Sequence, residues 1–323
     1  MAVMTSGTNG IPKILFRSFE SWADFFAIQN AVFGVDADSR LFVQGSLAFT
    51  GNLNLYMGQL AAGGTLIAED VFLPGKCEQV MARERANGIY LIPSKLLMLP
   101  RVFKGVNANI RTIISGSQSL GRKDAEVLKK IFPNTEITLY YGASELNYIT
   151  YVKSADMTEE RNLIGKPFPG VRVFIQDDEM YVDNAFHVEN ITVPYSLKDS
   201  GRMDTQGNFY FLGRTDDIVG VRGRKVSMMK IENALEEVAG ITEAAVVLLP
   251  KEKDADMPAE IVSAFVTVEG TDVPENLRQQ LKEKLADFEI PKRVIVLEAF
   301  PKNTSGKVDK VRLKKMWIEQ EPQ

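Results

Sequence analysis

The sequence predicts an α/β fold: a large domain with a mostly parallel sheet and a small antiparallel β subdomain, followed by a smaller C-terminal α+β domain. Three features of the 323 residues support this prediction. Short apolar runs alternate with helical patterns in the first part, which is typical of a parallel sheet with helices on both faces. A turn-rich segment with short strand-like runs comes next. Helix and strand patterns then mix in a last part of about domain size.

In the first part, each expected helix has apolar residues three or four positions apart. Ser21 is expected to cap the first helix, and Gly63-Gly64 is expected to end the second. Further helices are expected near residues 76–86, 94–103 and 121–132, and strands at 65–68, 89–92, 110–114 and 137–141.

Domain boundaries are expected where this pattern changes. Residues 1–213 are expected to form a partial large domain, with an α/β part at 1–165 and the β subdomain at 166–213. A charged stretch at 214–217 is expected to be a hinge. Residues 218–323 are expected to form a mobile C-terminal domain.

Composition limits the kinds of function. Lys and Arg number 38 and Asp and Glu 42, so the net charge of −4 gives no support for nucleic acid or an anionic membrane surface as a partner. Cys77 is the only cysteine and His187 the only histidine, which excludes an intrachain disulfide and a cysteine-cluster metal site. No apolar run approaches about 18 residues, and no signal-peptide pattern stands at the start. We therefore expect a cytoplasmic enzyme or binding protein without a membrane span.

A segment near the start, rich in hydroxyls and glycines, fits a loop that holds phosphate. Glycines let backbone N–H groups approach an anion, and hydroxyls add further donors. It is not a Walker A loop, because its lysine follows a proline. A polar turn between a strand and a helix explains the same residues equally well. The segment comprises Thr5, Ser6, Gly7, Thr8, Asn9, Gly10 and Lys13.

Three later segments have polar residues at places suited to a ligand. Residues 140–145, Tyr-Tyr-Gly-Ala-Ser-Glu, end an apolar run, and in an open α/β sheet ligands bind beyond the carboxyl ends of strands. An aromatic ring can stack on a base, and a carboxylate can hold Mg²⁺. Residues 213–225 contain arginines and lysines suited to ribose and phosphate, and residues 301–307 end on a lysine. Taken alone, each segment is explained as well by a strand end or a solvated loop.

Taken together, in their order and spacing, these segments resemble the AMP-forming acyl-adenylating superfamily, which includes acyl-CoA synthetases, luciferases and the adenylation domains of peptide synthetases. Residues 4–14 resemble its phosphate loop, and residues 140–145 resemble its aromatic-Gly-x-Thr-Glu motif, with Ser144 in place of threonine. Residues 213–232 resemble its hinge motif and the loop after it, and residues 301–307 resemble its catalytic-lysine motif. The resemblance covers essentially the whole chain.

The resemblance implies a role for each matched residue. Lys307 would contact the carboxylate and the α-phosphate, Glu145 would hold Mg²⁺, and Asp216 would be the hinge. Tyr141 would stack on adenine, and Asp199 and Arg214 would hold the ribose. The nucleotide-binding residues would be Thr5, Ser6, Gly7, Thr8, Asn9, Gly10, Lys13, Ser115, Gly116, Ser117, Tyr141, Gly142, Ala143, Ser144, Asp199, Arg214 and Lys225.

The resemblance also implies a reaction in two steps. A carboxylate attacks the α-phosphate of ATP, which gives an acyl-adenylate and pyrophosphate, and the thiol of CoA or of a phosphopantetheine carrier protein then takes the acyl group. Mg²⁺ and positioned cations would lower the barrier for an anion that attacks a polyanion. The C-terminal domain is expected to rotate at Asp216 between the steps and to withdraw Lys307.

Two departures from the family pattern concern the nucleotide site and the start of the chain. Lys198 and Leu197 precede Asp199 where Thr-Gly is usual, and Lys225 replaces an arginine and its bidentate fork, so we expect weaker nucleotide binding. Family members have a long segment before the phosphate loop, which begins here at residue 5. A fragment, an engineered piece and a minimal natural variant all fit. An incomplete sheet would expose an edge, so a homo-oligomer through the large domain is one expectation.

The neighbourhood of Thr50 informs the choice of acid. In the family the acyl pocket lies mostly between the phosphate loop and the aromatic-Gly motif, and members that activate amino acids have an aspartate there. Counting back from Gly63-Gly64 places that position near Thr50, and residues 47–53 contain no acidic side chain. An α-amino group would lack its counter-ion, which favours a fatty or aryl acid. D-Alanine or another amino acid for a carrier protein, and an inactive nucleotide-binding fragment, stay open as alternatives.

Overall fold

The computed structural model divides the chain into two compact units. One unit comprises Met1–Leu197 with Gly201–Phe211, and the other comprises Lys198–Ser200 with Leu212–Gln323. No helix in the described part of the chain is long and apolar enough to cross a membrane. The structure describes residues 2–4, 14–47, 50–221, 223–251, 260–302 and 308–319.

The first unit is built on a sheet whose central strands are parallel. Strand β3 pairs in parallel with β4 on one side and β5 on the other, and the parallel pairing continues through β6 to β7. Each of these strands is short and follows a helix or loop, as the alternating sequence pattern predicts. The strands are β3 (Arg40–Gln44), β4 (Thr65–Glu69), β5 (Gly88–Tyr90), β6 (Thr112–Gly116) and β7 (Glu136–Ala143).

The antiparallel strands extend this same sheet. The order is β10-β11-β12-β13-β9-β8-β7-β6-β5-β3-β4, eleven strands in all. The sequence indicated an antiparallel β unit but not its continuity with the parallel part, because the strand that joins them, β8, directly follows a tight turn after β7. The added strands are β8 (Asn147–Lys153), β9 (Leu163–Pro167), β10 (Arg172–Gln176), β11 (Glu179–Asp183), β12 (Tyr195–Met203) and β13 (Phe209–Arg214). A separate hairpin joins β1 (Ala2–Met4) to β2 (Ile14–Phe16).

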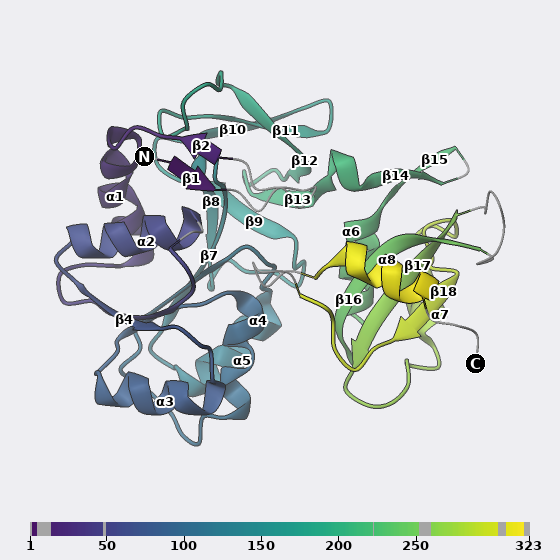
Figure 1. The fold of residues 1–323 in the computed structure, drawn as a ribbon, viewed down its shortest axis with the longest axis horizontal. Coiled ribbons are helices and arrows are strands. Elements are labelled where there is room, and N and C mark those ends of the chain that lie inside the picture. The colour runs from purple at the N-terminus through teal and green to yellow at the C-terminus, as the bar shows by residue number, and fades with distance from the viewer. Residues whose placement is uncertain are drawn as a thin grey trace. The chain divides into compact units, whose positions relative to one another are not determined.

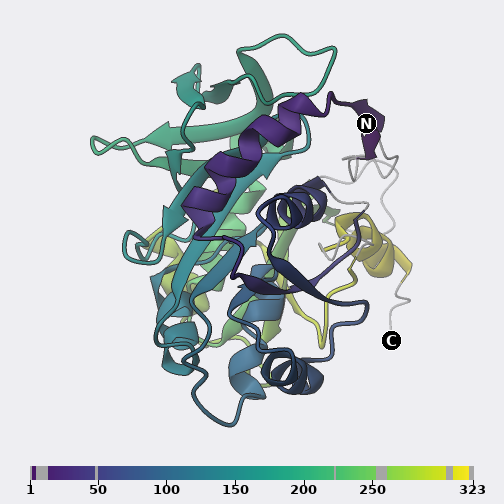
Figure 2. The same ribbon diagram turned by 90° about the vertical axis from the view of Figure 1, so that its left-hand side faces the viewer.

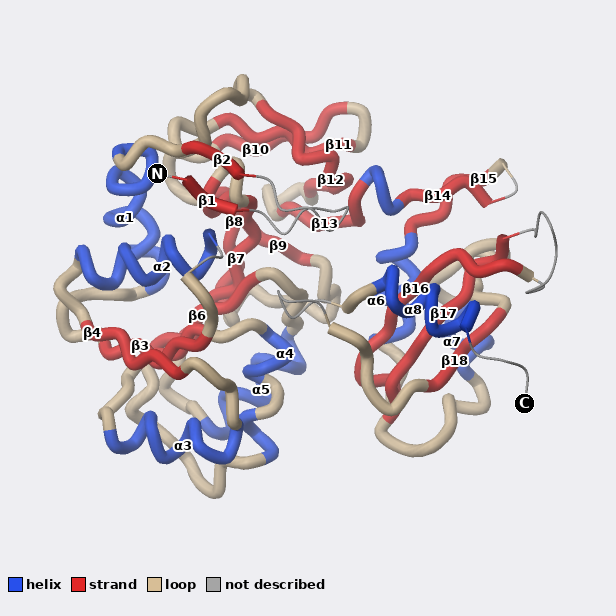
Figure 3. The backbone as a smooth tube through the Cα atoms, in the orientation of Figure 1, coloured by secondary structure: helices blue, strands red, loops and turns tan. Residues whose placement is uncertain are grey.

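Helices cover both faces of the parallel strands. Because side chains alternate along a strand, Phe42 packs with buried residues of the helices α3 and α5, whereas Leu41 and Val43 pack with those of α1 and α2. Figure 3 shows β3 and β4 between α2 and α3, Figure 1 shows β4 in the same place, and Figure 2 shows α1, in purple, beside α2. The helices are α1 (Glu20–Phe33), α2 (Thr50–Ala61), α3 (Pro74–Arg83), α4 (Pro93–Leu96) and α5 (Arg122–Ile131), with a 3₁₀ turn at Leu99–Arg101.

The prediction that Ser21 caps the first helix is wrong. Helix α1 begins at Glu20, so Ser21 lies inside its first turn. The hydroxyl of Ser18 accepts a hydrogen bond from Ser21 N at 3.2 Å, and Ser21 Oγ donates to Ser18 O at 2.9 Å. Each serine side chain thus bonds to a backbone group of the other at the start of the helix. Ser18 precedes the first turn and Ser21 lies within it.

The second unit is an α+β domain around a three-stranded sheet. Strand β16 is buried on both faces: Ala244 and Val246 pack with residues of α6 and α7, and Ala245 and Val247 pack with Leu313 of α8. The order of the strands is β16-β17-β18, and β14 and β15 form a hairpin of their own. The elements are β14 (Ile218–Val221), β15 (Arg224–Ser227), α6 (Met228–Glu236), β16 (Ile241–Pro250), β17 (Glu260–Val268), α7 (Leu277–Lys282), β18 (Arg293–Val296) and α8 (Lys310–Glu319).

Two buried amides fix α2 against α1. Gln29 Nε2 donates to Asn54 O at 3.1 Å, and Asn30 Nδ2 donates to Gly58 O at 2.8 Å. The helices come this close because residue 58 has no side chain: a Cβ there would lie 1.9 Å from Gln29 Nε2. The position of α2, and of its first turn, therefore depends on Gly58.

Gly58→Ala is expected to lower the free energy of unfolding by about 1–3 kcal/mol, because the Gln29 amide must move away from the added methyl group. This loss outweighs the gain in helix propensity of up to about 1 kcal/mol. Gly75→Ala in α3 is the matched control, since nothing lies within 4 Å of a Cβ there. Urea unfolding measures both variants, and equal stabilities would contradict the packing argument.

Candidate active site

The carboxyl ends of β6 and β7 bring two predicted segments together. Ser115 is opposite Leu139 and Gly116 is opposite Tyr140 in the parallel register. The end of β6 and Ser117 after it therefore lie beside the end of β7, residues 141–143, and the turn at residues 144–146. This is the edge at which open α/β sheets bind ligands.

The end of β6 combines a fixed side chain with an unusual backbone. Ser115 is fully buried, and its Oγ donates to Leu91 O at 2.7 Å, so its hydroxyl holds β6 to the neighbouring segment. Ser117 is exposed and has a φ of +68°, in the left-handed region that serines rarely adopt. Such outliers cluster at ligand sites, because the backbone is turned there to present its polar groups.

The turn after β7 is held tightly and presents Glu145. A Cβ on Gly142 would lie 2.6 Å from Asn147 O, so only glycine allows β7 and β8 to approach here. Glu145 O accepts a hydrogen bond from Val188 N at 2.9 Å, and Leu146 O accepts one from Asn184 Nδ2 at 3.0 Å. The backbone of Glu145 is thus fixed. Its half-buried side chain extends from a turn that follows Ala143, the last residue of β7, and that also contains Ser144.

Tyr141 lies at the same edge with a partly open ring. The ring is half-buried and contacts that of Phe211, with 5.9 Å between their centroids and 35° between their planes. An aromatic ring that is held on one side and partly open can stack on a base.

Asp199 and Arg214 come together in the second unit. Asp199 is 8% exposed, and its Oδ1 lies 3.7 Å from Arg214 Nε. Lys198 has a φ of +64°, and its carbonyl accepts a hydrogen bond from Thr215 Oγ1 at 2.9 Å. The carboxylate and the guanidinium, which are 15 positions apart in the sequence, therefore form one polar site.

Two predicted segments lie outside the described residues. These are the phosphate loop, with Thr5, Ser6, Gly7, Thr8, Asn9, Gly10 and Lys13, and residues 303–307 with Lys307. The side chains of Asp216 and Lys225 are also outside the described part. Both stems of the Lys307 segment are described: Lys302 bridges to Val308, and Asp309 N donates to Pro301 O at 2.8 Å.

Glu145 provides a carboxylate of the kind that binds magnesium. The described residues contain no group of three or more His, Cys, Asp and Glu side chains that could hold a metal ion. Mg²⁺ does not need such a group, because it is held by one or two carboxylates together with substrate phosphates and water. A single carboxylate on a fixed turn, as Glu145 provides, is sufficient for that arrangement.

A cluster of tyrosines beside this site is absent from the sequence predictions. Tyr90 ends β5, Tyr140 lies in β7 and Tyr148 lies in β8, and all three are at least 93% buried (5%, 7% and 2% exposed). The hydroxyls of Tyr90 and Tyr140 are 2.8 Å apart, and Tyr148 Oη donates to Gly51 O at 3.0 Å. Tyr90 ends β5, Tyr140 lies in the second half of β7 and Tyr148 stands near the start of the antiparallel β8, so all three fall at this edge. A sequence read one residue at a time does not reveal that they form a cluster.

The first turn of α2 closes the same region. Thr50 is 6% exposed and Asn54 2% exposed, and they lie four positions apart on one side of the helix. Within the described residues, Thr50 Oγ1 and Asn54 Oδ1 have no hydrogen-bond partner. The position expected to contact the acid is therefore polar, uncharged and buried.

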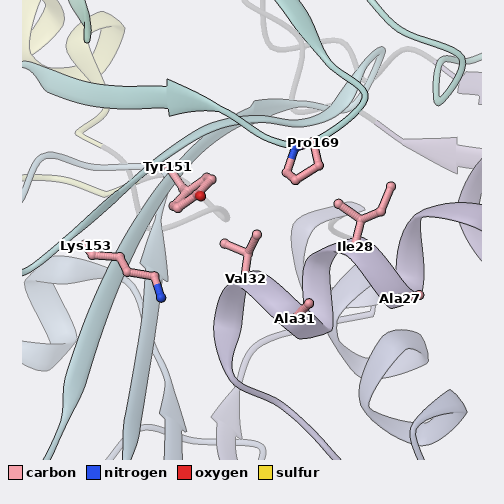
Figure 4. Close-up of a pocket in the computed structure, with 7 residues that line it drawn as sticks. All are labelled: Ala27, Ile28, Ala31, Val32, Tyr151, Lys153 and Pro169. Atoms are coloured by element: carbon pink, nitrogen blue, oxygen red, sulfur yellow. The ribbon is translucent and has the colours of Figure 1, made fainter. Parts of the chain in front are cut away.

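An open cavity of about 480 Å³ lies elsewhere on the first unit, between α1 and β8. Figure 4 shows its apolar wall on α1, opposite Tyr151 and Lys153. Lys153 is paired with Thr138 near the start of β7, so this cavity lies toward the amino ends of the parallel strands. It is distant along β7 from the segments that the sequence singled out.

Comparison with known families agrees with this geometry. A model of AMP-binding enzymes matches residues 2–185, more than half of the chain. The chain belongs to the AMP-binding enzyme family. A second model, of the AMP-binding enzyme C-terminal domain, matches residues 230–307. The predicted superfamily is confirmed, and with it the class of AMP-forming acid–thiol ligases.

Individual relatives of this family member are moderately similar. The acyl-CoA ligase YhfT of Bacillus subtilis (strain 168) is 26% identical over 99% of this chain and 68% of its own length. The 2-succinylbenzoate–CoA ligase of Listeria monocytogenes is 25% identical over 96% of this chain and 68% of its own. A linear gramicidin synthase polypeptide of Brevibacillus parabrevis is 26% identical over 96% of this chain, which is 7% of its own length. The chain thus spans about two thirds of the two ligases.

Solved structures confirm the predicted fold class. The ATP-bound RpMatB-BxBclM chimera B1 matches with a TM-score of 0.84 and 24% identity over 99% of this chain and 68% of that one. The O-succinylbenzoate CoA synthetase MenE of Bacillus subtilis, in complex with ATP and magnesium, matches with a TM-score of 0.81 and 20% identity over 95% and 68%.

Alkaline titration is expected to reveal the buried tyrosines. Burial raises the pKa of Tyr56 and Tyr140 to about 12, and it raises the pKa values of Tyr90 and Tyr148 well above that of a free tyrosine. The raised pKa values mean that these groups favour the folded state below pH 10 and that this contribution is lost as the pH rises through about 12. We expect late tyrosinate absorbance that coincides with unfolding followed by circular dichroism. Tyr140→Phe is expected to remove part of the late step, and ionisation of all nine tyrosines at pH 10 in the folded chain would contradict the buried cluster.

Proposed function

We propose that this chain activates a carboxylic acid with ATP and transfers the acyl group to CoA. The observation that carries the proposal is the register of β6 and β7, which gathers Ser115–Ser117, Tyr141 and Glu145 at one edge of the sheet. A ring, a rigid backbone edge and a fixed carboxylate are what an adenine nucleotide with its metal ion requires.

The described residues suggest how ATP is held. Tyr141 stacks on the adenine, and the backbone at Ser115–Ser117 lines the edge of the base. Asp199 accepts hydrogen bonds from the ribose hydroxyls, and Arg214 holds that carboxylate in place and adds positive charge. The loop at residues 5–13 is proposed to bind the phosphates.

The first chemical step joins two anions, so charge stabilisation is its central requirement. The carboxylate oxygen of the acid attacks the α-phosphorus of ATP, and the bond to pyrophosphate breaks. Glu145 would hold Mg²⁺ together with the phosphates, and the ion would supply positive charge. Lys307 is the residue proposed to neutralise the developing charge between the carboxylate and the α-phosphate.

The second step replaces AMP by a thiol. The thiol sulfur of CoA forms a bond to the acyl carbon, the bond between that carbon and the AMP oxygen breaks, and the thiol proton is released to the solvent. We propose that the C-terminal part turns at Asp216 between the steps, so that Lys307 serves only the first. A cytoplasmic location is part of the proposal, because ATP and CoA are both present there. A homo-oligomer through the large domain stays a prediction, and light scattering tests it.

The surroundings of Thr50 argue for an acid with an uncharged tail. A buried hydroxyl does not neutralise an ammonium group, so an α-amino acid would lose its solvation without a counter-ion. A fatty or aryl acid is therefore proposed. The likeness to a gramicidin synthase keeps an amino acid for a carrier protein as the second candidate.

Lys307→Ala is expected to lower acid-dependent ATP–pyrophosphate exchange by about 10²–10³-fold, because one charge-stabilising donor is lost from the transition state. Lys314→Ala is the matched control: Lys314 is an exposed lysine on α8, and the exchange assay contains no CoA. Pools of fatty, aryl and amino acids identify the class of acid. Exchange that is unchanged in Lys307→Ala, or absent with every pool, would overturn the proposal.

A further inference from the structure

We infer that Tyr140 forms a bar across the acyl site and limits the acid to a short aliphatic chain, such as acetate, propionate or butyrate. This inference rests on the proposed function and narrows the proposed class of fatty and aryl acids. Its basis is the packing of three tyrosines and two glycines where β5, β6 and β7 end under α2.

Alternation along the strands puts Tyr90 and Tyr140 on the same face of the sheet as Ile114. All three belong to the core between the sheet and the helices α1 and α2. Tyr90 is opposite Ile114, and Tyr140 is opposite Gly116, two residues further along β6. The two tyrosines are thus separated by one intervening strand, at a position where that strand has no side chain.

Gly116 is what allows Tyr140 to cross this strand. A Cβ on Gly116 would lie 2.4–2.7 Å from three atoms of the Tyr140 ring. The ring therefore lies directly on the backbone of β6 and fills the space that a side chain would take. Its hydroxyl reaches Tyr90 Oη at 2.8 Å, and the two rings are nearly parallel, at 17°.

Helix α2 packs equally closely against the two tyrosines from the other side. A Cβ on Gly51 would lie 3.0 Å from Tyr140 Oη and 3.4 Å from Tyr90 Oη. Tyr148 completes the wall, since its ring lies 4.4 Å from that of Tyr140 and its hydroxyl donates to Gly51 O. Between the sheet and the first turn of α2, the space beyond Tyr140 is therefore filled by tyrosine.

A long or cyclic acyl group would have to displace Tyr140 from these contacts. This displacement would break the hydrogen bond between Tyr140 Oη and Tyr90 Oη. Two buried hydroxyls would then lack that partner, and the close-packed interior would have to rearrange, both of which cost free energy. A short alkyl group ends before the bar and needs no rearrangement. The hydroxyl pair is uncharged, which agrees with an alkyl tail rather than a charged one.

Binding of stable acyl-adenylate mimics tests the inference without requiring turnover. Calorimetry is carried out on this chain with AMP and with acetyl-, propionyl-, butyryl-, octanoyl- and benzoyl-sulfamoyl adenosine. We expect AMP and the three short mimics to bind, and the octanoyl and benzoyl mimics to bind about 100-fold or more weakly than the propionyl mimic.

Two variants change the site in opposite directions. Tyr140→Leu shortens the bar and is expected to reduce the octanoyl-to-propionyl difference by about 10-fold or more. Gly51→Ala adds a methyl group in front of the bar, favours the helix, and is expected to weaken the propionyl mimic relative to the acetyl one. Tyr181→Leu is the matched control, because Tyr181 stacks on Phe174 in the β10–β11 hairpin. It is expected to leave all ratios unchanged.

The outcomes separate this inference from the proposed function. Failure of AMP and all mimics to bind would overturn the proposed function, and the inference would fall with it. Binding of AMP with equal affinity for octanoyl and propionyl mimics in the unchanged chain would overturn the inference alone. Unchanged affinity ratios between the mimics in both Tyr140→Leu and Gly51→Ala would also overturn the inference. If one variant failed to fold, the other would still report on the space next to Tyr140.

Discussion

The parallel pairing of β6 with β7 is the constraint on which the candidate site depends. It sets Gly116 opposite Tyr140, and the proposed nucleotide edge and the proposed wall of the acyl site both depend on that register. A shift of one residue would turn Tyr140 to the opposite face of the sheet and would replace Gly116 by a residue with a side chain. The backbone hydrogen bonds between β6 and β7 thus determine where the proposed nucleotide and acyl sites meet, and the side chains determine their detailed shape.

Motif positions could be predicted from the sequence because each motif is contiguous. The alternation of strands and helices predicted the parallel sheet, and residues 115–117 and 140–145 fall at its carboxyl edge without any long-range information. The Tyr90–Tyr140 pair could not be predicted in this way. Its two members are 50 positions apart, and their contact exists only because Gly116, on a third segment, has no side chain.

The continuity of the sheet is a second feature that could not be predicted from the sequence. The runs that became β10, β11 and β13 were recognisable as strands, but their joining to β7 through β8 and β9 depends on pairing partners, which composition does not specify. Likewise, Ser18 and Ser21 are equally good residues at the start of a helix, and tertiary contacts decide where α1 begins.

If the acyl site is as proposed, Gly51, Gly116 and Tyr140 allow substitutions to enlarge it more easily than to narrow it. Enlarging it requires only a smaller side chain at Tyr140, since Gly116 and Gly51 are already minimal. Narrowing it requires one methyl group at either glycine, against backbone that the β6–β7 register and the α1–α2 amide bonds hold in place. A size limit set by backbone positions is sharper than one set by flexible side chains, because the wall on the far side of Tyr140 does not yield. If the proposed function is correct, selection among acids by length is therefore expected to be strict in this chain.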